Sequence, residues 1–119
     1  MSTADTKTQI GRAVERFGAE VPALRQLKLV IRLQLLARGD VPTWRVEVPG
    51  PSISKDPAAD ARLDISIPRS HFNELADKGT LRDWAEAYDH GHVNVSGEGA
   101  VVKLVGNVIE RQLARTRHA

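Results

Sequence analysis

The chain has 119 residues, with 17 lysines and arginines against 15 acidic residues, and it contains no cysteine. This length suits one domain that buries a core of its own. The absence of cysteine excludes a disulfide framework, thiolate metal sites and cysteine nucleophiles. With a net charge of +2, two phenylalanines and one tyrosine, the chain offers few stacking platforms, so we expect no nucleic-acid partner.

We expect a single domain over residues 1–119, with residues 1–7 and 116–119 frayed at its ends. The first 20 residues lack the continuous apolar run of a signal peptide. No stretch reaches the ~18 apolar residues of a membrane-spanning helix, so we expect no integral membrane segment. A chain without cysteine fits a reducing compartment, and we expect a cytoplasmic location.

The N-terminal part is predicted to form a helix followed by a β-hairpin. Ile10, Val14 and Phe17 recur at the spacing of one helix face. From Leu27 onward apolar and polar residues alternate, which is the period of a half-buried strand. The expected elements, in chain order, are a helix at about residues 6–19, a helical turn at 23–26, a strand at 27–36, a turn at Gly39–Asp40 and a strand at 43–48.

The next segment begins with loop signals over residues 49–59, within which we expect a short edge strand at 52–55. Alternation over residues 62–67 predicts a further strand, which Pro68 ends.

Two short helices are expected next. Ser70 is placed to cap the first of them. Thr80 is placed to cap the second, with Asp83 at the position that completes a capping box. The side chains expected to face inward from these two helices are Phe72, Leu75, Ala76, Leu81, Trp84, Ala85 and Tyr88.

The last part of the chain is predicted to form one strand and one long amphipathic helix. Val93 and Val95 alternate with polar residues between Gly91 and Gly97, as in a half-buried strand. Beyond Gly97 the apolar period changes to that of a helix face. The expected apolar stripe of this helix is Val101, Leu104, Val105, Val108, Ile109 and Leu113.

Gly106 lies in the middle of that helix, where glycine costs ~1 kcal/mol relative to alanine. Two interpretations stay open. Either another backbone approaches the helix closely at this point, or the missing side chain leaves room for a ligand.

Asp89, His90 and His92 form the sequence cluster nearest in character to a metal or catalytic site. A metal site needs about three or four ligands with supporting partners, and no third strong ligand is evident nearby in the sequence. We interpret the cluster as a solvated turn and His71 as a surface residue. We therefore expect no metal ligand, no catalytic residue and no cofactor.

The predicted order is helix, three or four strands, two helices, one strand and one helix. Runs of strands followed by runs of helices predict an α+β fold, in which an antiparallel sheet carries its helices on one face.

Residues 23–113 resemble the sterol carrier protein type 2 domain family. The resemblance lies in the ordered combination of RLDISIPRSHF, GHVNVSG and AVVKLVGNVI, with Phe72, Gly91 and Gly97 at the family's spacing. It implies a five-stranded, mainly antiparallel sheet with helices packed on one face and a hydrophobic cavity between them. It also implies binding of a sterol, fatty acid, acyl-coenzyme A or phospholipid without chemical change.

We therefore expect a non-enzymatic lipid-binding or lipid-transfer protein. In its cavity the polar tips of Trp84 and Tyr88 would anchor a headgroup or hydroxyl. The residues expected to line the cavity are Leu33, Trp44, Val46, Ile65, Phe72, Leu75, Trp84, Tyr88, Val101, Leu104, Val105, Val108 and Ile109.

Two other functions stay open. One is an accessory subunit with a filled core that presents a surface to a lipid-metabolising enzyme. The other is a small enzyme that uses the pocket, with His90 or His92 as its base. The oligomeric state is not indicated by the sequence.

Overall fold

The structure, a computed structural model, describes residues 3–39, 41–48 and 51–117. Asp40 of the expected turn, Pro49 and Gly50 of the expected loop, and the extreme ends lie outside the described residues. The elements are α1 (Thr3–Glu20), the 3₁₀-helix η1 (Pro22–Gln26), β1 (Leu29–Leu36), β2 (Thr43–Val48), β3 (Ser52–Ser54), β4 (Leu63–Pro68), α2 (Arg69–Lys78), α3 (Leu81–Asp89), β5 (Asn94–Gly97) and α4 (Gly99–Arg117). Their order confirms the order predicted from the sequence.

The five strands form one sheet in the order β3-β2-β1-β4-β5. Neighbouring strands are antiparallel except β1 and β4, which pair in parallel at the centre. The expected α+β fold with a mainly antiparallel sheet is therefore confirmed, with a parallel pair that makes the sheet mixed. The register places Leu33 of β1 opposite both Trp44 and Ile65, so the apolar sets of neighbouring strands share one face.

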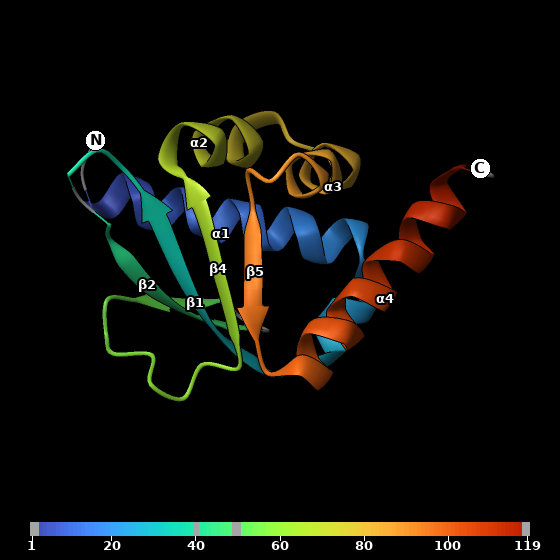
Figure 1. The fold of residues 1–119 in the computed structure, drawn as a ribbon, viewed down its shortest axis with the longest axis horizontal. Coiled ribbons are helices and arrows are strands. Elements are labelled where there is room, and N and C mark those ends of the chain that lie inside the picture. The colour runs from blue at the N-terminus through green and yellow to red at the C-terminus, as the bar shows by residue number, and fades with distance from the viewer. Residues whose placement is uncertain (1–2, 40, 49–50, 118–119) are drawn as a thin grey trace.

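The helices cover that apolar face. Helix α1 crosses behind the strands, α2 and α3 lie over the upper end of the sheet, and α4 projects past β5 (Figure 1). Ile10 of α1, Leu35 of β1 and Phe72 of α2 belong to one buried core, in which Leu35 is 0% exposed. In contrast, α4 makes its main contacts with β5 and η1 rather than with the middle of the sheet.

The connection from β3 to β4 explains the parallel pair. Because β4 lies beside β1, residues 55–62 must pass β2 and β1 to reach it, and they do so on the face opposite the helices. Arg32 of β1 donates a hydrogen bond to the carbonyl of Ala58 at 2.8 Å and pairs with Asp64 at 2.9 Å. Arg45 of β2 donates to both carboxylate oxygens of Asp60, which holds the pKa of Asp60 below its usual range.

Two expected helix starts need correction. Helix α1 begins at Thr3 rather than near residue 6, and Thr6 is buried and accepts a hydrogen bond from Arg69 at 2.6 Å, which anchors the start of α1 to α2. Helix α2 begins directly after Pro68, and Ser70 lies inside its first turn. Pro68 brings the strand to an end and leads straight into the helix, so the serine has no capping position to fill.

The capping box of α3 is confirmed. The Asp83 N–H donates to Thr80 Oγ1 at 3.3 Å, and the Thr80 N–H donates to Asp83 Oδ2 at 2.9 Å. Thr80→Ala removes one of these bonds and should lower the free energy of unfolding by about 1 kcal/mol in urea denaturation. Ser70→Ala, at a serine that makes no cap, is the matched control and should change it by less than about 0.5 kcal/mol. Equal losses in the two variants would contradict the assigned cap.

Candidate functional site

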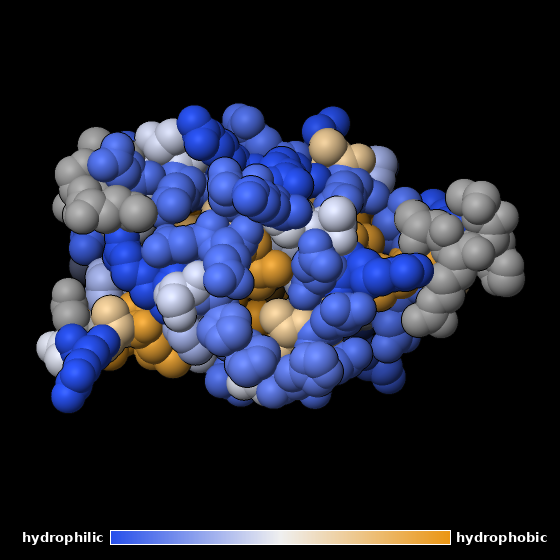
Figure 2. Space-filling model, turned by 90° about the horizontal axis from the view of Figure 1, so that it is seen from above, coloured by the Kyte–Doolittle hydropathy of each residue, from blue (hydrophilic) through white to orange (hydrophobic). Residues whose placement is uncertain are grey.

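A groove of about 790 Å³ lies between the apolar face of the sheet and the helices. Its floor is formed by strand residues such as Leu33, Val46 and Ile65, and its walls come from α1, α2, α3 and α4. The volume lies within the range of small-molecule sites in proteins. Figure 2 shows the molecule from above. Hydrophilic side chains cover most of the surface in this view, and hydrophobic ones show through gaps between them, one of which lies near the middle.

An aromatic cluster fixes three of the groove's helices relative to one another. Trp84 of α3 meets Phe17 of α1 edge to face, with ring centroids 5.7 Å apart, and it meets Phe72 of α2 at 6.2 Å in the same manner. All three rings line the groove. Edge-to-face pairs of this kind add ~0.5–1.5 kcal/mol to the burial of the rings. The cluster therefore gives the groove a rigid apolar wall.

Within the described residues, charged side chains border the groove at a few positions only. Glu15, Arg25, Asp89 and Glu110 are exposed members of its lining. Arg25 lies against Gly18 of α1, where an added Cβ would be 3.1 Å from the Arg25 Nε. The groove thus combines an apolar interior with charged side chains at its solvent-exposed parts, which suits a molecule with an apolar body and a polar end.

Helix α4 faces the groove with a different stripe from the one expected. Val102, Val105, Ile109 and Leu113 line the groove, together with Gly106. Apolar residues at helical spacing occur on two overlapping stripes of α4, and the sequence alone does not decide which of them faces the sheet. The expectation that Leu104 is buried is wrong, because its side chain is 46% exposed.

The structure brings most of the expected cavity residues together. Those that line the groove are Leu33, Val46, Ile65, Phe72, Trp84, Tyr88, Val105 and Ile109. Those that do not line it are Trp44, Leu75, Val101, Leu104 and Val108. Trp44 is buried in the core and Leu75 packs against that core, so both face inward but lie outside the groove lining. Tyr88 lines the groove while 53% exposed, so it stands at the groove's opening.

Several lining residues were missing from the expected set. One group of them comes from α1, which contributes the apolar side chains of Ile10, Val14 and Phe17. The sequence did carry their signal, because these three residues define the apolar face of the first helix. The resemblance begins at residue 23, so it gave no reason to assign that face to the cavity.

Gly106 borders the groove, and an added Cβ there would meet nothing within 4 Å. No backbone approaches α4 closely at this residue, which contradicts the first of the two interpretations. The space beside Gly106 belongs to the groove.

His71, His90 and His92 are outside the groove lining. The His92 ring stacks on the His71 ring with centroids 4.1 Å apart, while His90 lies 6.2 Å from His92 and caps the end of α3. None of these three lines the groove, so the arrangement that would favour a histidine base there is not found. His71 is half-buried rather than a simple surface residue, and its pairing with His92 was not foreseen because the two are far apart in sequence.

Among the described helices, none is both long and apolar enough to cross a membrane.

No protein-family model matches the chain, and no curated protein matches it. Solved structures do. Palmitated SCP2L2 from Aedes aegypti is 18% identical, with a TM-score of 0.58 over 82% of this chain and 91% of its own. Sterol carrier protein 2-like 2 from the same organism is 19% identical, with a TM-score of 0.57 over 88% and 97%. UbiJ-SCP2, a ubiquinone synthesis protein, is 15% identical, with a TM-score of 0.51 over 94% and 95%.

At these identities the similarity establishes the fold. The chain has the α+β fold of sterol carrier protein 2, so the resemblance expected from the sequence is confirmed at that level.

Proposed function

We propose that this protein binds one lipid-like molecule in the groove and carries it without altering it chemically. The observation that carries the proposal is the apolar groove itself, about 790 Å³ in volume and walled by helices over an apolar sheet face. Burial of an apolar chain there contributes ~25 cal/mol per Å², less the free energy of association. The shared fold with sterol carrier protein 2 supports the same reading. A sterol, fatty acid, acyl-coenzyme A or phospholipid has the required apolar body.

The first test is native mass spectrometry of the purified protein, which should detect one co-purified lipid per chain. A fluorescent fatty acid should then bind with a stoichiometry of about one and be displaced by the natural lipid. Absence of saturable binding by acyl chains, sterols and acyl-coenzyme A alike would refute the proposal. Because the chain lacks cysteine, we further propose that the carrier works in the cytoplasm.

Gly106→Leu tests the groove directly. Leucine favours a helix by ~1 kcal/mol over glycine, and nothing obstructs the new side chain, so the thermal stability of the lipid-free protein should hold or rise. The leucine should occupy groove volume and weaken lipid binding by about tenfold or more, measured by fluorescent displacement.

The matched control is Asn107→Leu, which adds a similar side chain at the next residue, outside the groove lining. Its lipid affinity should equal that of the wild type. If Gly106→Leu instead destabilised the lipid-free protein while its folded fraction bound lipid normally, the groove assignment of this residue would be wrong.

A second candidate function is an accessory role beside a lipid-metabolising enzyme. The observation that favours it is the fold shared with UbiJ-SCP2, a ubiquinone synthesis protein. The version of this role that requires a filled core does not agree with the open groove. An accessory protein that presents a bound lipid to an enzyme does agree with it. In that case the enzyme's rate on the presented lipid should fall with Gly106→Leu and not with Asn107→Leu.

A further inference from the structure

Helix α4 has a second side, which is turned away from the groove. Its position follows from the 3.6-residue period of the helix, because Val105 and Ile109 line the groove from the opposite side. Figure 1 shows α4 at one end of the molecule, with no other labelled element beyond it. We call this side the outer face of α4, and it consists of Lys103, Leu104, Val108, Arg111 and Arg115. Val108 is half-buried, and the other four residues are exposed.

The outer face carries positive charge that no carboxylate balances. Helix α4 holds four of the 17 lysines and arginines of the chain but one of its 15 acidic residues, Glu110, which lines the groove instead. Among the described residues, no carboxylate forms an ion pair with Lys103, Arg111 or Arg115. In α1 and in α2, by contrast, lysines and arginines equal the acidic residues in number, and in α3 the acidic residues outnumber them.

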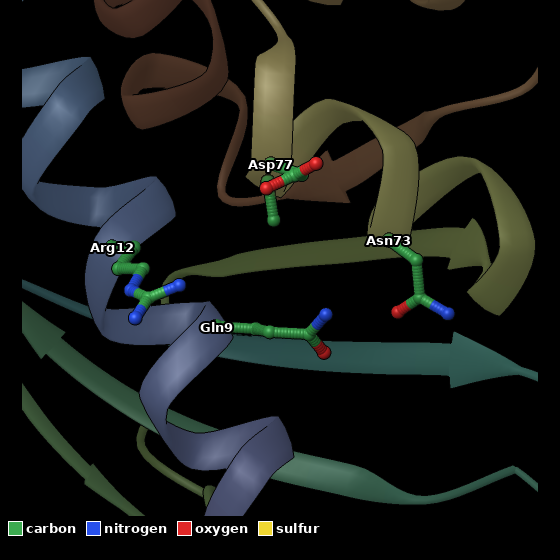
Figure 3. A pocket seen from close by; sticks show the side chains of 5 residues that line it. Gln9, Arg12, Asn73 and Asp77 are labelled. Carbon is green, nitrogen blue, oxygen red and sulfur yellow. The ribbon is translucent and has the colours of Figure 1, made fainter. Parts of the chain in front are cut away.

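Cations on the neighbouring helices have partners or nearby anions within the fold. Arg12 of α1 and Asp77 of α2 border one small hollow of about 180 Å³ between these helices (Figure 3). Arg16 of α1 donates hydrogen bonds to the carbonyls of Ala76 at 3.3 Å and Asp77 at 2.9 Å, which ties the end of α2 to α1. The cations of the outer face have no comparable role inside the molecule, so they are available to a partner.

Apolar side chains lie among these cations. Leu104 is 46% exposed, and Val108 follows it one turn later on the same face. A helix whose exposed face combines apolar residues with lysines and arginines suits the interface of a membrane, where the apolar groups meet the acyl boundary and the cations meet anionic headgroups. A nucleic acid would use the cations but would leave the leucine without an apolar contact. The combination therefore favours a lipid surface.

We propose that the outer face of α4 docks on the surface of a membrane that contains anionic phospholipids. The helix lies in the plane of the interface, with Leu104 directed toward the acyl chains. Lys103, Arg111 and Arg115 bind the headgroup phosphates, whose charge is complementary to theirs. This docking does not depend on which ligand the groove holds, because no residue of the outer face lines the groove.

The test is co-sedimentation of the protein with phospholipid vesicles. Vesicles of phosphatidylcholine alone are compared with vesicles in which about one third of the lipid is phosphatidylglycerol. The protein should bind the anionic vesicles about tenfold or more tightly than the neutral ones. Raising the salt concentration from about 0.05 M to about 0.5 M should release it, because salt screens the attraction. Absence of vesicle binding, or equal binding to the two kinds of vesicle, would overturn the proposal.

Two substitutions in the outer face each have a matched control in the connection between β1 and β2. Leu104→Asp should weaken binding to anionic vesicles by about tenfold or more, whereas Val41→Asp, at a side chain that is 50% exposed, should leave it unchanged. Arg111→Gln should weaken it by about fivefold, whereas Arg38→Gln, at another exposed arginine, should not. Thermal melts check that each variant is folded. Losses of equal size in the outer-face variants and their controls would contradict the assigned surface.

Two further measurements separate this docking from other binding. Heparin and duplex DNA are polyanions without an acyl region, and the protein should bind both more weakly than anionic vesicles at the same salt concentration. Tighter binding to either of them would assign the outer face to a polyanion and overturn the proposal. Fluorescent fatty-acid binding in the groove should be the same in all four variants, since none of the changed residues lines the groove. Failure of vesicle docking is thereby distinguished from failure of the lipid site.

Discussion

Val101→Asp should lower the free energy of unfolding by about 3 kcal/mol or more, whereas Leu104→Asp should change it by no more than about 0.5 kcal/mol. Both residues lie on α4, one turn apart, and both were expected to be buried. The structure leaves Val101 8% exposed and Leu104 46% exposed. A carboxylate at residue 101 would be buried without a partner, while the same group at residue 104 would stay hydrated.

Urea denaturation of the two variants, with the slope of each transition compared, is the measurement. It also decides how α4 is oriented, because the two aspartates probe adjacent faces of the same turn. If Leu104→Asp were the more damaging change, the helix would be rotated relative to the structure described above. In that case Val102 and Val105 would not face the groove.

Gly97→Ala should be nearly as damaging, with a loss of about 3 kcal/mol. Gly97 ends β5 with a φ of 130°, a conformation that L side chains rarely adopt. An added Cβ would be 2.5 Å from the Arg62 carbonyl oxygen and 3.0 Å from the Leu63 Cα. These are backbone atoms of β4 and of the residue directly before it, and they cannot move away without breaking the pairing of Leu63 with Gly97.

Gly99→Ala is the matched control, because an added Cβ at Gly99 meets nothing within 4 Å. Gly99 begins α4, so alanine there should leave stability unchanged or raise it by up to about 1 kcal/mol. Thermal melts of the two variants should therefore move in opposite directions or differ strongly. A Gly97→Ala variant as stable as the wild type would show that the close approach of β5 to β4 is wrong.

The helices and strands were predictable because their signals are local. Alternation identified the strand at 62–67, and the Thr80–Asp83 spacing identified a helix cap, since each depends on neighbours a few residues away. The misjudged start of α2 is also a local matter, because Pro68 and Ser70 compete as start signals. In α2 the proline prevailed.

The parts that could not be predicted depend on contacts between distant residues. Nothing in the local pattern of β1 or β4 states that Ile31 pairs with Leu63 in parallel, because that pairing follows from the path of residues 55–62. The face of α4 that lines the groove follows from its contacts with β5 and η1. The stacking of His71 on His92 likewise requires α2 to meet the turn that leads into β5.

The same reasoning covers the groove that we assign as the binding site. The apolar groove was expected from the alternation of the strands and from the resemblance, although five of its expected lining residues lie elsewhere.

The order of the strands also bears on how copies of this protein behave toward one another. The sheet ends on its two shortest strands, β3 with three residues and β5 with four, while the longest strand, β1 with eight, lies in the middle. An edge strand exposes unpaired N–H and C=O groups that recruit another chain, and short edges are one means by which proteins limit this. The long, leucine-rich strand is thereby kept from edge-to-edge association, which protects a protein with an open apolar groove from aggregating through its sheet.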